Sequence, residues 1–409
     1  MYYGRSLQKK WLKVSESFPV LLLTGPRQVG KTTMLKNIRE KKRKYVSLDD
    51  LSLRTLAKED PVLFLKQYSP PVIIDEIQYA PELMPYIKLA VDSSGGKGQY
   101  WLTGSQQFQM MKGITETLAG RVAIVNMLGL SLREKAAGKM NLELPPFIPD
   151  DETIKIRRSD SRHSLKKDIF TDIWRGSFPA LIENPETDSD VYFSSYLQTY
   201  LQRDVRDLSQ VGNLQSFTTF LKVCAARTGQ LLNISDIAKD SNISIPTAKN
   251  WLSILEASCQ IFLLYPFHSN ITKRLIKTPK LYFLDTGFCS YLTGWSSPET
   301  LSSGAMSGHI FETYVFTEIL KSWWNSIRTP QIFYYRDKDC REIDILILKD
   351  NTIYPVEIKK SATVKSDWAR HFDAVSRFSE KKGHGAVICM NSEEVPVRTG
   401  VMAIPVSYI

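Results

Sequence analysis

The first third of the chain contains three short apolar runs that each end in small or polar residues. They are "FPVLLLT" (18–24), "PPVIID" (70–75) and "GQYWLTG" (98–104). Runs of this length without polar alternation are typical of buried strands. Met34, Leu35 and Ile38 follow the first run at helical spacing, after a glycine-containing loop. The pattern therefore predicts an α/β core.

The middle of the chain changes from a polar segment to helical periodicity. Residues 137–168 are rich in charge and lack sustained periodicity, which indicates a linker or lid. A helix is predicted over 189–208, where the recurring positions are Tyr192, Tyr196, Leu197, Tyr200 and Leu201. Residues 232–267 predict a short helix, a turn, a second helix capped near Ser244 and a strand, the form of a helix-turn-helix.

The C-terminal part combines a helix with a hairpin. The helix is predicted in "GHIFETYVFTEILKSW" (308–323), with apolar Phe311, Val315, Ile319 and Trp323. In "REIDILILKDNTIYPVEIKK" (341–360), two strand-like runs flank a turn at 349–351. With period two, Asp344 shares one face of the first strand with leucines, and isoleucines take the other face. Both faces are apolar, so we expect this strand to lie inside a sheet.

Composition adds an indication about partners. The 409 residues carry 53 Lys and Arg against 43 Asp and Glu, giving a formal net charge of +10. This excess favours an anionic partner such as DNA, although a solvated basic surface explains it too. The five cysteines are scattered singly, which fits a reducing cytosol. No apolar run reaches the ~18 residues that span a bilayer, so we expect a cytoplasmic protein outside the membrane.

The loop after the first strand has the pattern of a phosphate-binding loop, G-x-x-x-x-G-K-[ST], between a strand and a helix. Its residues are Gly25, Pro26, Arg27, Gln28, Val29, Gly30, Lys31 and Thr32, followed by Thr33. Glycines let successive backbone N–H groups face phosphates at a helix N-terminus. We therefore expect ATP here, with Lys31 reaching the terminal phosphates and Thr32 binding Mg²⁺.

The ends of the other two strands supply candidate catalytic groups. Asp75 and Glu76 have the form of a Walker B segment, in which Asp75 holds the metal and Glu76 polarises the attacking water. The third run ends in polar Thr103, Ser105 and Gln106. Polar residues at such a strand end can act as a sensor that contacts the γ-phosphate or the attacking water. We include Ser105 among the expected nucleotide contacts. Arg121 is a candidate cation for the transition state, acting in its own subunit or a neighbouring one. A surface arginine is the alternative.

With these motifs the chain resembles prokaryotic AAA-superfamily ATPases that carry a winged-helix region and a C-terminal restriction-endonuclease-like domain of uncharacterised function. The resemblance covers nearly the whole chain and also rests on "IWRGSFPALI" (173–182), "SSYLQTYLQRDV" (194–205) and "KLYFLDTGF" (280–288). It implies a P-loop AAA-type ATPase core at 1–140, linker and connector helices at 141–210, a winged-helix-like domain at 211–290 and a restriction-endonuclease-like α/β domain at 291–409.

The winged-helix interpretation gives the basic segment after the second helix a role. Lysines and an arginine would lie on the wing: Lys273, Arg274, Lys277 and Lys280. Winged helices bind duplex DNA or serve in protein interactions, and we favour DNA.

Three carboxylates of the C-terminal part are expected to point inward: Glu312 from the helix, and Asp344 and Glu357 from the two strands. Lys359 follows Glu357 by two residues. The resemblance implies that Asp344 and Glu357 bind Mg²⁺, that Glu312 acts directly or through water, and that Lys359 orients the attacking water. A structural ion pair between Glu357 and Lys359 is the alternative.

These observations predict Mg²⁺-dependent ATP hydrolysis coupled to a C-terminal half that binds DNA and has the residues to cleave it. The alternative is an ATP-gated scaffold or regulator that binds protein partners with an inactive nuclease-like domain. A homo-oligomer is compatible with either.

Overall fold

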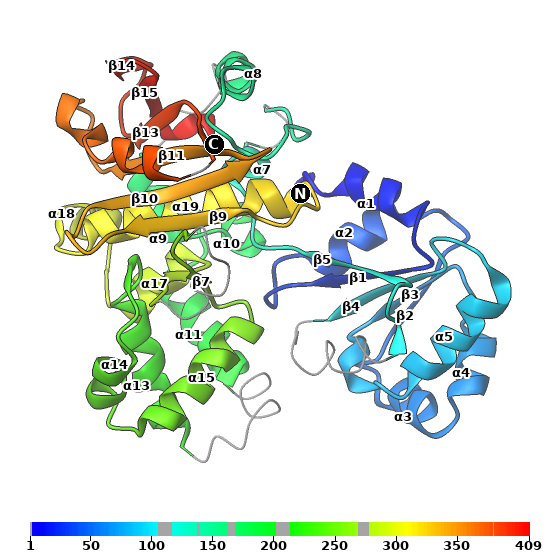
Figure 1. Cartoon of the computed structure of the whole chain (residues 1–409). Helices are drawn as coiled ribbons and strands as arrows, with labels where there is room; N and C mark the ends of the chain where they lie inside the picture. Colours follow the sequence, from blue (N-terminus) through cyan, green and yellow to red (C-terminus); the bar gives the residue numbers. More distant parts are fainter. Residues whose placement is uncertain are drawn as a thin grey trace.

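Figure 1 shows the computed structural model of the chain, which describes residues 2–104, 117–136, 140–161, 168–201, 213–268, 278–378 and 380–409. The N-terminal sheet and its helices (blue to cyan) lie on one side of the molecule. The C-terminal sheet (orange to red) and the middle helices (green) lie on the other. Ser105 and the expected wing residues Lys273, Arg274 and Lys277 fall outside the described residues, so what was predicted for them stays a prediction.

The apolar runs of the first third form a five-stranded sheet in the order β2-β3-β4-β1-β5. Its strands are β1 (Val20–Thr24), β2 (Lys44–Ser47), β3 (Val72–Asp75), β4 (Tyr100–Gly104) and β5 (Val122–Asn126). All four pairings are parallel, so the carboxyl ends of the strands meet at one edge. Because β4 lies between β1 and β3, a side chain near its end comes between the ends of those two strands.

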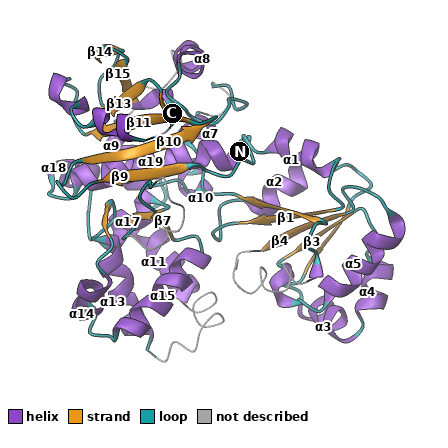
Figure 2. Ribbon diagram, viewed as in Figure 1, coloured by secondary structure: helices purple, strands orange, loops and turns teal. Residues whose placement is uncertain are grey.

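Helices cover both faces of this sheet (Figure 2). They are α1 (Gln8–Ser15), α2 (Lys31–Ile38), α3 (Leu51–Glu59), α4 (Pro61–Gln67) and α5 (Leu83–Ser94), with the 3₁₀ turn η1 (Ile77–Tyr79). Strand β1 explains why two layers are needed. Leu21 and Leu23 join one hydrophobic cluster, whereas Val20 and Leu22 join a second cluster on the opposite face. An all-apolar strand of this kind buries both faces.

The middle region consists of helices around a three-stranded antiparallel sheet, in the order β6-β8-β7. Its helices are α7 (Leu132–Lys135), α8 (Asp151–Ser161), α9 (Ile169–Arg175), α10 (Pro179–Glu183), α11 (Ser189–Thr199), α13 (Leu214–Ala225), α14 (Ile234–Asp240), α15 (Ile245–Ala257), α17 (Thr286–Leu292) and α18 (Pro298–Ser303); its strands are β6 (Gln230–Leu231), β7 (Ile261–Leu264) and β8 (Lys280–Phe283). The predicted pair of helices is confirmed as α14 and α15, and Ser244 caps α15 by accepting a hydrogen bond from the Thr247 amide.

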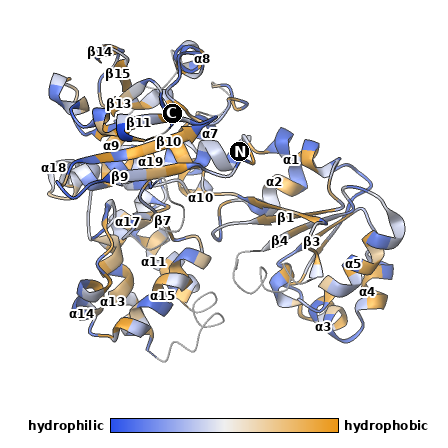
Figure 3. Cartoon of the chain, in the orientation of Figure 1, coloured by the Kyte–Doolittle hydropathy of each residue, from blue (hydrophilic) through white to orange (hydrophobic). Residues whose placement is uncertain are grey.

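The described part of the predicted linker is packed, contrary to the expectation of a linker or lid. Helix α8 contacts the 3₁₀ turn η5 (Val406–Tyr408) near the C-terminus. Arg158 on α8 forms an ion pair with Glu394. Although α8 is coloured mostly hydrophilic in Figure 3, its Arg157 is buried and donates to the Tyr408 carbonyl over 3.0 Å. The hydrophobic pattern missed this contact because it is polar.

The C-terminal sheet has the order β14-β15-β13-β11-β10-β9, with β12 beside β11. Its elements are β9 (Ile332–Arg336), β10 (Glu342–Lys349), β11 (Thr352–Lys359), η3 (Ser366–Ala369), η4 (Phe372–Arg377), β12 (Lys381–Lys382), β13 (Gly385–Cys389), β14 (Val395–Arg398) and β15 (Val401–Pro405). Strands β9, β10 and β11 are antiparallel, whereas β13 and β15 continue the sheet in parallel to β11. The predicted hairpin is confirmed, and its two turn residues, Asp350 and Asn351, have φ of 48° and 58°.

Helix α19 (Ser307–Asn325) connects the three sheets. It contacts β5 of the N-terminal sheet, β8 of the middle sheet and β11 of the C-terminal sheet. Its predicted apolar positions are buried, and they belong to one hydrophobic cluster that also contains Leu21 of β1 and Ile345 of β10. Glu318 and Lys321 form a buried ion pair on α19, with 2.8 Å between their charged atoms. The ATPase-like sheet and the C-terminal half therefore share one core.

Candidate functional site

The backbone of the phosphate-binding loop can be formed only with its glycines. Gly25 has φ of 142°, and a Cβ atom there would lie 2.0 Å from the Met127 carbonyl oxygen. Gly30 has φ of 90° and directly precedes the first residue of α2, Lys31. These conformations direct the loop around the N-terminus of α2, where N–H groups are free of intrahelical partners. The structure thus builds the loop that the sequence predicts.

The ammonium group of Lys31 lies inside this loop. Its Nζ donates to the carbonyl oxygens of Gly25 at 2.9 Å and Pro26 at 2.7 Å, and the side chain is buried. The positive charge is therefore held at the inner side of the curled backbone, which is the position needed to contact terminal phosphates.

Asp75 collects hydroxyl groups from three elements. Thr32 Oγ1 donates to its two oxygens at 2.9 and 3.0 Å, and the Tyr45 hydroxyl donates at 2.9 Å. Thr103 on β4 donates as well. Thr32 and Asp75 thus form the oxygen pair that a nucleotide-bound Mg²⁺ uses, so the residues fit this ion.

Two of these Asp75 partners bear on the sequence expectations. Thr103 is one of three sensor candidates and reaches Asp75 because β4 lies beside β3. Ser105 and Gln106 lie outside the described residues, so the choice among the three stays a prediction. Tyr45 was not identified from the sequence; it is a tyrosine in β2 that becomes informative once β2 is known to pair with β3.

Glu76 has the surroundings of a candidate general base. Its backbone is left-handed, with φ of 57° and ψ of 46°, and its amide donates to Thr103 Oγ1 over 3.3 Å. The Gln78 amide donates to its carboxylate. Burial raises the pKa of Glu76, and the nearby Lys31 charge lowers it. A raised pKa makes the carboxylate a stronger proton acceptor than an exposed glutamate.

The outer side of the loop packs on the middle region. The Tyr192 hydroxyl on α11 donates to Gln28 Oε1 over 2.7 Å. Pro179 at the start of α10 lies 3.8 Å from where a Cβ of Gly30 would be. The loop is therefore in contact with two helices that lead into the middle region. The hydrophobic pattern placed Tyr192 on the apolar face of a predicted helix. It did not identify Gln28 as its partner.

Arg121 is not near the loop of its own chain. It precedes β5, at the edge of the sheet where the strands begin, and its carbonyl accepts from the Val20 amide. Its guanidinium pairs with Asp92 on α5. The loop follows the other end of β1, so the geometry contradicts a role for Arg121 in its own subunit. The reason is the parallel strand order, which the local sequence does not reveal. A role toward a neighbouring subunit stays a prediction.

A second polar cluster lies between α19 and the C-terminal hairpin, and a lysine occupies its centre. Lys280 Nζ lies 3.1 Å from Glu312 Oε1, 2.6 Å from Glu342 Oε1 and 3.6 Å from Asp344 Oδ1. The Tyr282 hydroxyl donates to Glu312 over 2.6 Å. The expectation that Lys280 lies on a DNA-facing wing is therefore wrong. It begins the buried strand β8, and its side chain is 3% exposed.

Glu357 and Lys359 form a separate pair. Lys359 Nζ donates to Glu357 Oε1 over 2.6 Å. Asp344 Oδ2 instead accepts from the Ile358 amide at 2.9 Å. Burial, with the charge of Asp344 adding to it, raises the pKa of Glu357 to about 8, and burial raises the pKa of Glu312 to about 7 against the opposing charge of Lys280. The predicted inward orientation of these groups agrees with their burial.

The expected metal site of the C-terminal part stays a prediction. Across the described ranges, which include Glu312, Asp344 and Glu357, no group of three or more His, Cys, Asp or Glu side chains is placed to hold a metal ion. In this arrangement the ammonium group of Lys280 supplies positive charge to Glu312, Glu342 and Asp344.

Three family models match successive parts of the chain. Residues 17–136 match a family model described as an AAA domain. Residues 166–299 and 307–409 match two models that are each described as a domain of unknown function. The AAA match supports an AAA-type ATPase domain in the first third. Neither of the other descriptions names a winged helix or a nuclease, so both of those interpretations stay predictions.

Two relatives that match over most of the chain are each described as an uncharacterized protein. Proteins of Mycobacterium tuberculosis and Mycobacterium bovis are 24% identical over 394 residues, which cover 96% of this chain and 81% of each relative. Among solved structures, the Holliday junction branch migration motor RuvB of Thermotoga maritima is 15% identical with a TM-score of 0.30, covering 64% of this chain and 89% of that chain. At such a TM-score the likeness does not establish a shared fold.

A second solved structure is a signal transduction ATPase with numerous domains and a tetratricopeptide repeat sensor from Pyrococcus horikoshii. It is 13% identical with a TM-score of 0.25, covering 80% of this chain and 48% of that chain.

In the part of the chain that the structure describes, no helix combines the length and apolar character needed to cross a membrane.

Replacing Lys280 by Met tests the lysine-centred cluster. The change leaves Glu312, Glu342 and Asp344 close together without their shared cation, so we expect a loss of about 3–5 kcal/mol in the free energy of unfolding. Mn²⁺ should then raise the melting temperature of the variant more than that of the original chain, because the ion replaces the missing charge. Denaturant titration and melting curves of the full chain measure both effects.

Lys381→Met is the matched control, because Lys381 is exposed on β12. It should change stability by no more than about 0.5 kcal/mol and leave the Mn²⁺ response as it was. If the original chain gained as much from Mn²⁺ as the Lys280 variant, the lysine would not be occupying the metal position.

Proposed function

We propose that the protein hydrolyses ATP with Mg²⁺ at the phosphate-binding loop and uses the reaction to control a DNA-binding C-terminal half that does not cleave DNA. The observation that carries the ATPase part is the junction of Thr32, Asp75 and Thr103 beside Glu76 and Lys31. This junction unites a phosphate-binding loop, a metal-binding carboxylate and a base at one edge of the sheet.

In this mechanism each group has a separate task. Loop amides and Lys31 bind the phosphates, and Lys31 exchanges its bonds to Gly25 and Pro26 for phosphate oxygens. Glu76 accepts the proton of the attacking water. Thr103 fixes Asp75 and contacts the Glu76 amide, so it holds both carboxylates in register. A bound Mg²⁺ would neutralise charge that develops on the phosphate oxygens, with Thr32 and Asp75 as its protein contacts.

The contact between Gln28 and Tyr192 supports coupling to the rest of the chain. Gln28 belongs to the loop that surrounds the phosphates, and Tyr192 belongs to α11. A rearrangement of the loop on ATP binding or hydrolysis changes this hydrogen bond and the packing of Pro179 near Gly30. The loop therefore has a direct mechanical connection to the middle region, which a two-state switch requires.

The element order of the middle region supports the winged-helix interpretation. Helix α13 is followed by β6, α14, α15, β7 and β8, and the three strands form one antiparallel sheet. Lys249, Asn250 and Ser253 are exposed on α15, the second helix of the predicted helix-turn-helix. Such a helix is the element that enters a DNA major groove. We therefore place the DNA contact on α15.

Lys280 favours a C-terminal domain that binds without cutting. Three antiparallel strands followed by parallel β13 support the restriction-endonuclease-like topology that the resemblance implies. However, Glu312 and the expected metal ligand Asp344 are both paired with a buried lysine of the same chain. The specific observation that would favour cleavage, a free group of carboxylates, is missing from the described residues.

Two variants separate nucleotide binding from hydrolysis. Lys31→Ala removes the cation that contacts the phosphates, so ATP affinity or turnover should fall by at least about tenfold. Glu76→Gln keeps Asp75 and Thr32, so it should retain ATP binding and lower the turnover number by about 10²-fold or more. Titration calorimetry and a phosphate-release assay measure the two quantities. Normal turnover by the Lys31 variant would show that this loop is not the nucleotide site.

Loss of charge from α15 tests the DNA contact. Lys249→Ala should weaken duplex DNA binding several-fold and about equally for different sequences, and flatten the slope of log affinity against log salt by about one unit. Lys222→Ala is the matched control, because Lys222 is exposed on α13. Equal affinity of the two variants, or an affinity that does not depend on salt, would favour a protein partner for this region.

A further inference from the structure

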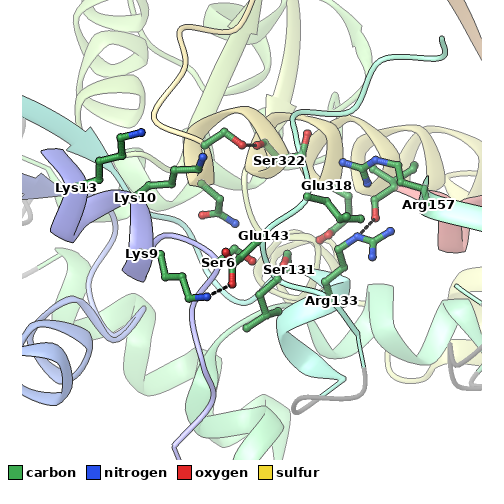
Figure 4. Close-up of a pocket in the computed structure, with 15 residues that line it drawn as sticks. Ser6, Lys9, Lys10, Lys13, Ser131, Arg133, Glu143, Arg157, Glu318 and Ser322 are labelled. Atoms are coloured by element: carbon green, nitrogen blue, oxygen red, sulfur yellow. Dashed lines mark hydrogen bonds and ion pairs between the residues drawn. The ribbon is translucent and has the colours of Figure 1, made fainter. Parts of the chain in front are cut away.

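A cavity of about 220 Å³ lies where the N-terminal and C-terminal halves of the chain meet (Figure 4). Its wall comes from α1, the segment after β5, α8, the end of α19 and the last residue of the chain. Figure 4 shows Lys10 and Lys13 of α1 on one side, and Arg133 and Arg157 on the other. None of these residues belongs to the proposed nucleotide site.

Arg157 is a buried cation without a carboxylate partner among the described residues. It is 1% exposed. Two of its N–H groups donate to main-chain carbonyls, those of Tyr408 at 3.0 Å and Pro145 at 2.8 Å, and its guanidinium lies 5.4 Å from the centre of the Phe147 ring. Its Nε is buried and has no partner in the described structure. A buried charge of this kind is costly unless an anion compensates it.

Arg133 increases the positive charge at the same place. It is 6% exposed, donates through Nε to the Ile409 oxygen at 3.1 Å, and pairs with Asp160. Its Nη2 is buried and, within the described ranges, lacks a partner. Burial lowers the pKa of Arg157, and the charge of Arg133 lowers it further. Two guanidinium groups that repel each other therefore lie close together, and the carboxylate of Asp160 pairs with only one of them.

The acidic side chains in the wall are already engaged. Glu143 forms an ion pair with Lys9. Glu318 accepts from the Leu132 amide at 2.8 Å and pairs with Lys321 at 2.8 Å. Lys10 and Lys13 have no ion pair with any described residue, and both are exposed at the mouth of the cavity. Among the described residues, the cavity therefore has unpaired donors from both sides and no acidic side chain without a partner.

We propose that this cavity binds the phosphate or diphosphate group of a small phosphorylated molecule. The two arginines present fixed N–H groups that match a tetrahedral oxyanion, and the lysines close the mouth as point charges. The volume suits a small molecule rather than a polymer. Because α1 belongs to the N-terminal half, and Arg133 and Arg157 bond to the last residues of the chain, a bound phosphate joins the two halves.

The test uses the full chain with Lys31→Ala, which silences the phosphate-binding loop, and pyrophosphate as the probe. Titration calorimetry should show one remaining site, and pyrophosphate should raise the melting temperature. Adding Lys10→Ala and Lys13→Ala should weaken pyrophosphate binding by about tenfold or more, because two exposed cations at the mouth are lost. These lysines are on the surface, so the fold should be retained.

Two further variants complete the test. Arg157→Lys keeps the charge and removes the fixed fork of N–H groups, so it should weaken pyrophosphate binding more than it lowers stability. Lys58→Ala, an exposed change on α3, should leave the affinity as it was. Absence of pyrophosphate binding in the Lys31→Ala chain would overturn the proposal, and so would an affinity that is unchanged when Lys10 and Lys13 are both removed.

Discussion

Burial of α19 against all three sheets is the constraint on which the rest of the structure depends. A helix with apolar residues on one stripe needs one partner surface, but α19 contacts β5, β8 and β11 and is buried along most of its length. Its polar residues also bind a neighbouring segment, the one that follows β5. Lys321 donates to the Leu130 carbonyl, and Glu318 accepts from the Leu132 amide. The segment leaving the ATPase-like sheet is thereby fixed to the core of the C-terminal half.

This shared core explains why the phosphate-binding loop and the Lys280 cluster differ in what surrounds their charged groups. The phosphate-binding loop lies at the carboxyl ends of the strands of a parallel sheet, where the N–H groups at the start of α2 lack intrahelical partners and can meet a ligand. The C-terminal cluster lies against α19, and β8 enters it from the middle sheet with Lys280 in its first position. Because β8 packs against the cluster, Lys280 of the same chain supplies the charge that balances its carboxylates. The same packing that joins the halves therefore places a positive charge beside these carboxylates.

The local elements could be predicted from the sequence, and the partners across elements could not. The loop at Gly25–Thr32, the hairpin and the helix containing Phe311 follow from spacing alone, because each depends on residues close in sequence. Tyr45, Tyr192 and Lys280 depend on which elements become neighbours. Lys280 illustrates the difference: its basic surroundings in the sequence indicated a wing, but alternation with Tyr282 in a buried strand decides its position. Arg121 depends on strand direction in the same way, since its position before β5 places it away from the loop of its own chain.

The lysine-centred cluster also bears on whether a nuclease-like domain can activate water for cleavage. A divalent ion offers two charges and open coordination positions for water, whereas an ammonium group offers one charge and three donors that Glu312, Glu342 and Asp344 surround. The carboxylates are stabilised in both cases, but only the ion can activate water. Catalysis would require Lys280 to leave, which exposes three carboxylates to mutual repulsion in a buried site. That cost falls on β8, the strand that follows the predicted DNA-binding helices. A movement of those helices large enough to displace β8 is therefore a route by which ATP hydrolysis could reach this cluster.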